Sequence, residues 1–345
     1  MAHTLNCSLD VAIIYFYTVL VGLSSLIAVT GLWLFAKKWQ ARIVCCVGVF
    51  ILAYVSWLLG DEYILSFCTV AYIPLVLYLF EKKSNFVLGL ALFAFGFIVV
   101  YANFCRIHTG TLLVLVIAMR LFLYKQKKRL KALLGTIFLI GFMIAQYSIT
   151  SLFLARNTYL LKHDYTVQTT GHKHTFWHNV YPGLGFIEND KNLYFADACS
   201  AEKVKSINPE AQYLSAPYNT ILMHEVMFLC GQSPHFVLRV FFAKLGVLFY
   251  YLLLCLLPAV WALCLPYMPL RIHACYWVAM VWGALPGLLT IPNALYILGF
   301  LASAWLYGFH AMVYALNNQT FSFSFYRIKT FFLQLFHTAR QMEWQ

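Results

Sequence analysis

Long apolar runs separated by short polar segments constrain the fold of this chain more than any other feature. Crossing about 30 Å of hydrocarbon takes about 20 residues of α-helix, and the run from Val11 to Ala36 exceeds that length. Backbone groups inside hydrocarbon must be hydrogen-bonded internally, which only helices and closed barrels achieve. The runs lack the polar–apolar alternation of barrel strands. The sequence therefore predicts an all-α polytopic membrane protein.

The composition excludes an ordinary soluble protein. Only 10% of the 345 residues are charged and 62% are hydrophobic, whereas soluble domains carry about 25% charged residues. The net charge of +12 does not point to nucleic acid, because many basic residues lie between the apolar runs, and we expect no nucleic-acid partner. The first run is too long for the apolar part of a signal peptide and is expected to stay in the membrane.

About nine transmembrane helices are expected. Their ranges are 11–36, 43–60, 63–80, 86–104, 109–124, 132–154, 243–265, 272–290 and 292–316. In the short fifth helix, Arg120 is expected to extend its charged end to the interface. Pro292 suits the first turn of the ninth. The chain then divides into helices one to six (1–154), a large loop (155–242), helices seven to nine (243–316) and an amphipathic tail (317–345).

The charges between the helices predict the orientation. Basic residues concentrate in the odd-numbered loops and the tail: Lys37, Lys38, Arg42, Lys82, Lys83, Lys125, Lys127, Lys128, Arg129, Lys131, Arg271, Arg327, Lys329 and Arg340. The short even-numbered loops hold few. Because basic loops stay in the cytoplasm, we expect the N-terminus outside, the C-terminus inside and loop 155–242 on the extracytoplasmic side.

Loop 155–242 is the long segment with the composition of a soluble domain. A helix is expected from about 218 to 230, with Gly231 following its C-terminal end. Ser233 and Pro234 are typical of the start of another helix, which is expected to run along the membrane surface into helix seven. A disulfide between Cys199 and Cys230 is chemically open on the oxidising side.

Two polar clusters have more than one interpretation. The spacing of His172, His174 and His178 is compatible with a metal held by imidazole nitrogens, but no fourth ligand is obvious, and a structured loop is the alternative. The adjacent Asp61 and Glu62 fit an interfacial helix cap, or a cation-binding or catalytic pair beside an outer cavity. A metal ligand set is not assigned.

Basic and aromatic residues near the outer interface are the candidate site. Arginine and lysine there can hold the phosphate of a lipid carrier, or they can be anchors that reach water. Aromatic rings can stack on a sugar or lie at the headgroup level. The candidate substrate-binding residues are Arg106, His108, Trp177, His178, Tyr181, Arg239 and Lys244. We expect Arg106, His108, the segment 172–178 and Arg239 to converge near one outward-opening cavity.

Several segments resemble bacterial GT-C glycosyltransferase-like membrane proteins, distant relatives of the dolichyl-phosphate-mannose protein mannosyltransferases. The resemblance covers about residues 100–310 and is carried by the segments 106–110, 171–185 (GHKHTFWHNVYPGLG), 202–209, 233–246 and 285–292. It implies transfer of a sugar from a polyprenyl-phosphate carrier on the extracytoplasmic face of the bacterial inner membrane, without a nucleotide sugar and often with a divalent metal.

The chain departs from that family at its N-terminal end. The family's catalytic acid usually lies in the first extracytoplasmic loop, after the first transmembrane helix. This sequence has no corresponding helix and long loop, and Asp10 is the only acid near its N-terminus. No catalytic residue is therefore carried over.

Two classes of function follow. The first is a truncated or divergent GT-C-like protein that binds a polyprenyl-phosphate sugar and transfers it. The second is a non-catalytic membrane scaffold or lipid-binding subunit whose loop engages a partner. A transporter or channel is a third possibility, although no inverted repeat is visible.

The orientation can be checked with reporter fusions at Lys128 and Asp190. We expect the two fusions to report opposite sides of the membrane, because one position lies in a basic loop and the other in loop 155–242. Reporters on the same side would contradict the nine-helix topology.

Overall fold

The computed structural model describes residues 8–59, 63–82, 84–106, 108–162, 176–255 and 268–318. Within these residues every regular element is a helix. The helices are α2 (Leu9–Trp33), α3 (Trp39–Leu58), α4 (Ile64–Val70), α5 (Ile73–Lys82), α6 (Asn85–Cys105), α7 (Thr111–Leu123), α8 (Lys128–Lys162), α9 (Phe176–Gly183), the 3-10 turn η1 (Leu184–Phe186), α10 (Asp197–Ile207), α11 (Ala216–Gln232), α12 (Pro234–Cys255), α14 (Leu270–Leu289) and α15 (Leu298–Asn317). Eight spans among them are long and apolar enough to cross a membrane. The chain is therefore an all-α integral membrane protein.

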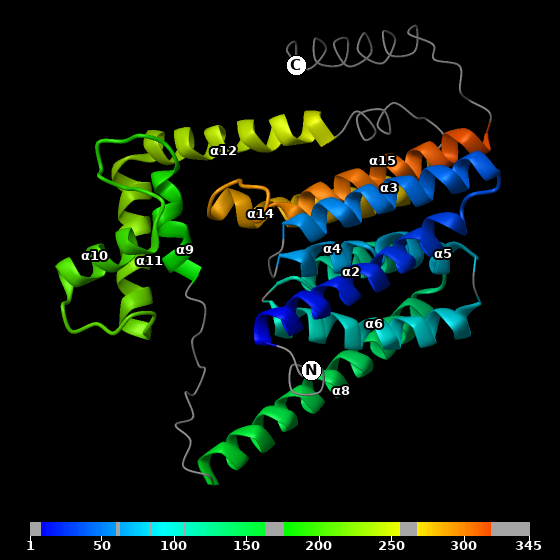
Figure 1. The fold of residues 1–345 in the computed structure, drawn as a ribbon, viewed down its shortest axis with the longest axis horizontal. Helices are drawn as coiled ribbons and strands as arrows, with labels where there is room; N and C mark the ends of the chain where they lie inside the picture. The colour runs from blue at the N-terminus through cyan, green and yellow to red at the C-terminus, as the bar shows by residue number, and fades with distance from the viewer. Residues whose placement is uncertain are drawn as a thin grey trace, which may run out of the picture.

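The apolar helices form a bundle, and the helices of the large loop form a separate unit at one end of it (Figure 1). The buried core draws on α2 to α7, α14 and α15. Helix α8 lies along α6, and α12 leads from the α9–α11 unit back along the bundle (Figure 1). The α9–α11 unit has a small hydrophobic core of its own.

Helix α15 is the central helix of the bundle. It packs against α14, α3 and α4, and 78% of its apolar window is buried within the protein. Small residues permit these close crossings: a Cβ on Gly283 of α14 would collide with the backbone nitrogen of Phe300. Where hydrocarbon surrounds the helices, such close backbone approach supplies much of the packing energy.

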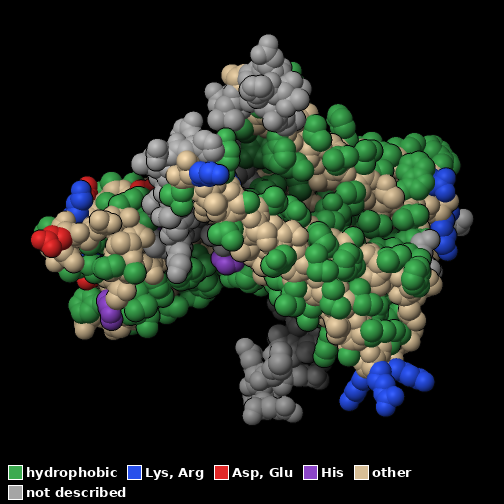
Figure 2. Space-filling model, turned by 90° about the horizontal axis from the view of Figure 1, so that it is seen from below, with side chains coloured by type: hydrophobic (Ala, Val, Ile, Leu, Met, Phe, Trp, Pro, Cys, Tyr) green, Lys and Arg blue, Asp and Glu red, His purple; other side chains and the backbone are tan. Residues whose placement is uncertain are grey.

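Contacts between helix ends bring the odd-numbered loops together at one end of the bundle. Arg271 Nε donates to Glu81 Oε1 at 2.8 Å, and the Lys37 amide donates to Asn317 Oδ1 at 2.8 Å. The first pair joins the seventh loop to the third, and the second pair joins the first loop to the C-terminal end of α15. On the face seen in Figure 2, most Lys and Arg side chains lie at the end opposite the α9–α11 unit, and Asp and Glu lie on that unit. The basic loops thus share one end, as their alternation requires.

Two predicted helix boundaries differ from the structure because of local backbone chemistry. The segment 63–80 is two helices in tandem, α4 and α5, since Pro74 lacks the N–H that a continuous helix needs. Helix α15 begins at Leu298, and Pro292 lies before it. There Asn293 Oδ1 accepts from the Tyr296 amide at 2.9 Å, a local turn that competes with the helix.

The helices flanking the large loop are longer than predicted. Helix α8 continues past residue 154 to Lys162, and α11 extends to Gln232 with Gly231 inside it. Helix α12 is one continuous helix from Pro234, where a surface helix followed by helix seven was expected. It is described to Cys255, so residues 256–265 of the expected span lie outside the described part. The amphipathic tail beyond residue 318 lies there too.

Arg120 does not extend to the interface. Its side chain is only 1% exposed and is the largest fully buried side chain among the described residues. The guanidinium carbon lies 5.2 Å from the centre of the Phe80 ring. The expectation of a solvated guanidinium was wrong because α5 and α14 cover this end of α7. The sequence of α7 alone does not show that other helices exclude water there.

The α6–α8 crossing offers a test of close packing. A Cβ on Gly141 would collide with the Phe93 carbonyl, whereas a Cβ on Gly135 of the same helix meets nothing within 4 Å. We expect Gly141→Ala to cost about 1–3 kcal/mol of stability and Gly135→Ala to be neutral. Thermal unfolding of the purified protein in detergent measures both, and equal midpoints would contradict the crossing.

Candidate functional site at the outer end of the bundle

The α9–α11 unit is built around the aromatic and aliphatic side chains of three short helices. Tyr181 and Leu184 from α9–η1 pack with Val204 of α10 and with Tyr218 and Leu222 of α11. Ser215 is the N-cap of helix α11: its hydroxyl accepts from the Tyr218 amide at 3.3 Å, which satisfies a backbone N–H of the first turn. The unit therefore has a hydrophobic core of its own, against which Phe236 and Val237 of α12 also pack.

His178 is the polar centre of this unit. Its side chain is buried, and its Nδ1 lies 3.0 Å from the Tyr218 hydroxyl. Its Nε2 lies 3.3 Å from both Asp197 Oδ1 and the Tyr213 hydroxyl. The His178 carbonyl accepts from Ser200 Oγ at 3.1 Å. One residue thus links α9, α10, α11 and the segment before α11.

The two phenols beside His178 stay protonated at neutral pH. Burial raises the pKa of Tyr218 and of Tyr213, and the negative charge of Asp197 adds to both shifts. Each hydroxyl can therefore donate or accept, and both ring nitrogens of His178 have a partner. A His–Asp pair is a general-base combination, but here its hydrogen bonds orient the ring within a core. The cluster fixes the fold of the unit.

The unit docks on the C-terminal end of α14 through Gly183. A Cβ at Gly183 would lie 2.5 Å from the Leu289 carbonyl and 2.8 Å from the Thr290 carbonyl, so only glycine permits this approach. Gly185 makes a similar approach to the backbone of Leu193 and Tyr194. Both glycines therefore lie where the backbone of another segment leaves no room for a Cβ.

Two cations of α12 lie on either side of this docking contact. Lys244 is 2% exposed, and its Nζ donates to the Leu288 carbonyl at 3.0 Å. Arg239 is more exposed, and its Nη2 donates to the Glu188 carbonyl at 3.3 Å. Lys244 thus bonds to the bundle, and Arg239 bonds to the loop unit. Both carbonyls are neutral acceptors, so the two charges are not neutralised by these bonds.

Arg106 and His108 lie in the turn between α6 and α7. The Arg106 guanidinium carbon lies 3.0 Å from the centre of the Tyr63 ring, which packs edge-on against Tyr296. His108 has a φ of 71°, and its carbonyl accepts from Trp282 Nε1 at 3.4 Å. This turn therefore contacts α14 directly, and Tyr63 connects it to the segment between α14 and α15.

The predicted site residues thus fall into two groups around one segment. Arg106 and His108 approach α14 and its connection to α15 from the α6–α7 turn. Lys244 and the segment holding Trp177, His178 and Tyr181 meet the end of α14 from the loop unit. Among the described residues no direct contact joins the two groups. Convergence on one cavity stays a prediction.

The aromatic residues of α9 differ in what they can offer a ligand. Tyr181 and His178 are buried in the core of the unit, so neither presents a surface to a sugar. Trp177 is partly exposed and packs edge-on against the exposed Phe176, with ring centres 4.9 Å apart. Phe176 was not among the predicted site residues, although its aromatic neighbour was a signal for it.

A metal or disulfide finds no support in the described part of the chain. Those residues contain no group of three His, Cys, Asp or Glu side chains placed to hold a metal ion. His172, His174, Asp61 and Glu62 lie outside the described residues, so the predicted spacing motif and acidic pair stay untested. Cys199 is buried and Cys230 is exposed, and both thiols are free.

Comparison with known proteins identifies no relative. No protein-family model, curated protein or solved structure matches the chain. The class that the fold defines is a polytopic α-helical membrane protein with a helical unit at one end of its bundle.

The His178 cluster predicts an effect of removing one hydroxyl. Tyr218→Phe leaves Nδ1 of the buried ring without a partner, which costs about 1–3 kcal/mol. We expect faster proteolysis within the α9–α11 unit and a lower unfolding midpoint. Tyr250→Phe, at an exposed position on α12, is the matched control. The same response from both variants would show that the cluster does not stabilise the unit.

Proposed function

We propose that this protein binds a polyprenyl-phosphate-linked sugar at the outer end of its bundle, in the manner of GT-C-like membrane proteins of the bacterial inner membrane. The observation that carries the proposal is the pair of α12 cations beside the docking contact. Lys244 and Arg239 there bond only to neutral carbonyls among the described residues. A buried cation is costly unless an anion compensates it. A lipid-linked phosphate supplies that anion at the membrane interface.

The surroundings of the two cations fit the rest of such a ligand. On α9, the exposed Phe176 and the partly exposed Trp177 form an aromatic pair, and aromatic faces bind sugar rings. The polyprenyl chain would lie in the membrane along exposed apolar residues of α12, such as Phe242 and Phe249. The proposed orientation follows the basic loops: N-terminus outside, C-terminus in the cytoplasm, and the α9–α11 unit extracytoplasmic. A nine-crossing topology adds the 13-residue α7 to the eight longer spans.

A non-catalytic scaffold or lipid-binding subunit is the second candidate. It is favoured by the His178 cluster, in which every polar group is engaged in holding the unit together. Among the described residues, no carboxylate forms an ion pair with Lys244 or Arg239. Binding without turnover is the behaviour that separates this candidate from an enzyme, whether or not a divalent metal is added.

Binding to a short-chain polyprenyl-phosphate hexose tests the proposal. Arg239→Ala is expected to weaken binding to the purified full chain by about 1.5–3 kcal/mol, the range for a hydrogen bond to a charged group. Because Arg239 is partly solvated, folding should be retained. Release of the hexose over time, with and without a divalent metal, distinguishes an enzyme from a binding subunit.

Arg156→Ala is the matched control for that experiment. Arg156 is exposed near the outer end of α8 and hydrogen-bonds to the neighbouring Asn157 at 2.8 Å. It should leave binding unchanged. Equal affinities of the two variants, or no binding by the parent protein, would overturn the proposed site.

A further inference from the structure

The opposite end of the bundle contains a polar cavity that the proposed function does not use. It has a volume of about 510 Å³ and lies between the ends of α5 and α7 and the beginnings of α6 and α14. Its charged lining residues are Arg120, Arg271, Lys125 and Glu81. This is the end where the basic loops meet, which we propose to be cytoplasmic.

Arg120 is the unusual member of this cavity. Its side chain is 99% buried, since only 1% is exposed, and its Nε and Nη1 have no hydrogen-bond partner among the described residues. No ion pair to it occurs among those residues either. The Phe80 ring and the nearby Glu81 offset part of its charge, but buried N–H donors without acceptors are costly in low-dielectric surroundings. Arg120 therefore lines the cavity and has two buried N–H donors without an acceptor among the described residues.

The charge balance of the cavity favours an anion. Glu81 is already paired with Arg271 at 2.8 Å, so Arg120 and Lys125 leave two formal positive charges unmatched. Helix α6 also begins at the cavity wall, at Ser84 and Asn85, and the N-terminus of a helix carries positive potential. A phosphate group matches both the charge and the fork of guanidinium donors.

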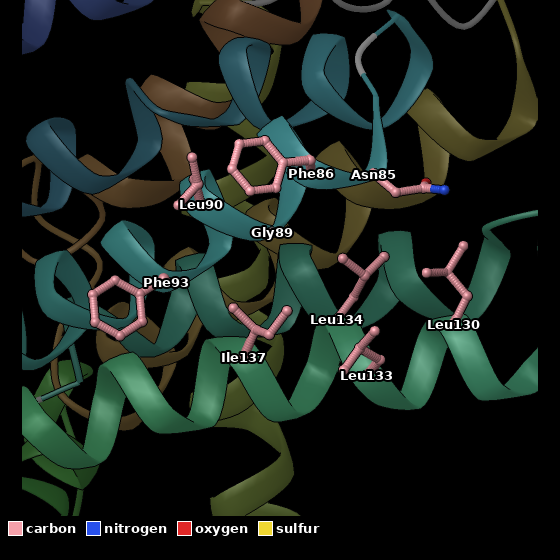
Figure 3. A pocket seen from close by; sticks show the side chains of 9 residues that line it. All are labelled: Asn85, Phe86, Gly89, Leu90, Phe93, Leu130, Leu133, Leu134 and Ile137. Carbon is pink, nitrogen blue, oxygen red and sulfur yellow. The ribbon is translucent and has the colours of Figure 1, made fainter.

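An apolar groove adjoins the cavity. It lies between α6 and α8, has a volume of about 490 Å³, and is lined by apolar side chains such as Phe86, Phe93, Leu133 and Ile137 (Figure 3). Asn85 lines both the groove and the polar cavity. A cationic cavity beside an apolar groove, with Asn85 common to both, provides the two surfaces that a phospholipid needs, one for its phosphate and one for an acyl chain.

We propose that this end of the protein binds an anionic phospholipid, with its phosphate at Arg120 and one acyl chain in the α6–α8 groove. The site lies across the bundle from Arg239 and Lys244 and does not depend on the proposed function. Anionic lipids are abundant in the cytoplasmic leaflet, which is the leaflet this end would face.

Thermal unfolding of the full chain in a neutral detergent tests the proposal, because a ligand that binds the folded state raises the midpoint. The probes are dioctanoyl phosphatidic acid, dioctanoylglycerol and inorganic phosphate. We expect phosphatidic acid to stabilise the protein and dioctanoylglycerol not to. Arg120→Gln should raise the apparent Kd for phosphatidic acid by about ten-fold or more. Arg129→Gln, an exposed arginine of the same basic segment that does not line the cavity, should leave it unchanged.

Two further variants keep the test decisive if Arg120→Gln does not fold. Glu81→Gln removes the only acidic group lining the cavity and should lower the Kd for phosphatidic acid. Gly89→Leu fills the groove beside Ile137 and should raise it, whereas Gly135→Leu, in open space on α8, should not. Arg239→Ala should leave this response intact, which separates the site from the proposed function.

The outcomes that overturn the proposal are specific. One is a parent protein that phosphatidic acid does not stabilise. Another is an equal Kd for Arg120→Gln and Arg129→Gln. If inorganic phosphate stabilises as strongly as phosphatidic acid and Gly89→Leu has no effect, the cavity binds a soluble phosphate and the lipid assignment is wrong.

Discussion

Hydrocarbon offers no hydrogen bonds, and the rest of this structure depends on that constraint. Each apolar helix satisfies its own backbone groups, so the helices can associate only through surface fit and the few polar groups that find partners. Glycines at the crossings provide the fit, as Gly96 and Gly141 do between α6 and α8. The same constraint makes every buried charge informative, because water is not present to solvate it.

Helices α14 and α15 connect the two ends of the molecule. At the outer end, the last turn of α14 supplies the carbonyls that meet Gly183 and Lys244. At the other end, Arg271 in its first turn pairs with Glu81. A shift of α14 relative to the bundle would therefore move a wall of the candidate sugar-phosphate site and a wall of the polar cavity together. The two proposed sites are chemically separate but share one rigid element.

The two ends use cations differently. At the outer end Lys244 and Arg239 bond to carbonyls of the bundle and of the loop unit, respectively, so both hold their charge beside a neutral acceptor. At the opposite end Arg120 is buried beside a cavity, and its Nε and Nη1 have no hydrogen-bond partner among the described residues. An anion at Lys244 and Arg239 would add to hydrogen bonds that already exist. An anion at Arg120 would accept from donors that otherwise have no partner. The second site is therefore expected to affect stability more strongly.

The sequence alone determined the class of protein and most of its helices, because apolar length and loop charge are local properties. Helices α2, α3, α6, α7 and α14 lie close to their predicted ranges, and the third, fifth and seventh loops meet around one cavity. Local reasoning could not show that Pro74 divides a span or that Asn293 delays α15, since both depend on competition between neighbouring hydrogen bonds.

Only the tertiary structure decided which polar residues are enclosed. His178 looked like a ligand of a metal or sugar, yet Tyr218 and Tyr213, 40 and 35 residues away, supply its partners. Arg120 looked like an anchor that reaches water, yet α5 and α14 bury it. The burial of a side chain depends on which distant segments pack around it. The spacing of residues along one helix does not show this. The physical reason is that hydrophobic patterning identifies the helices, whereas charge burial depends on how those helices pack.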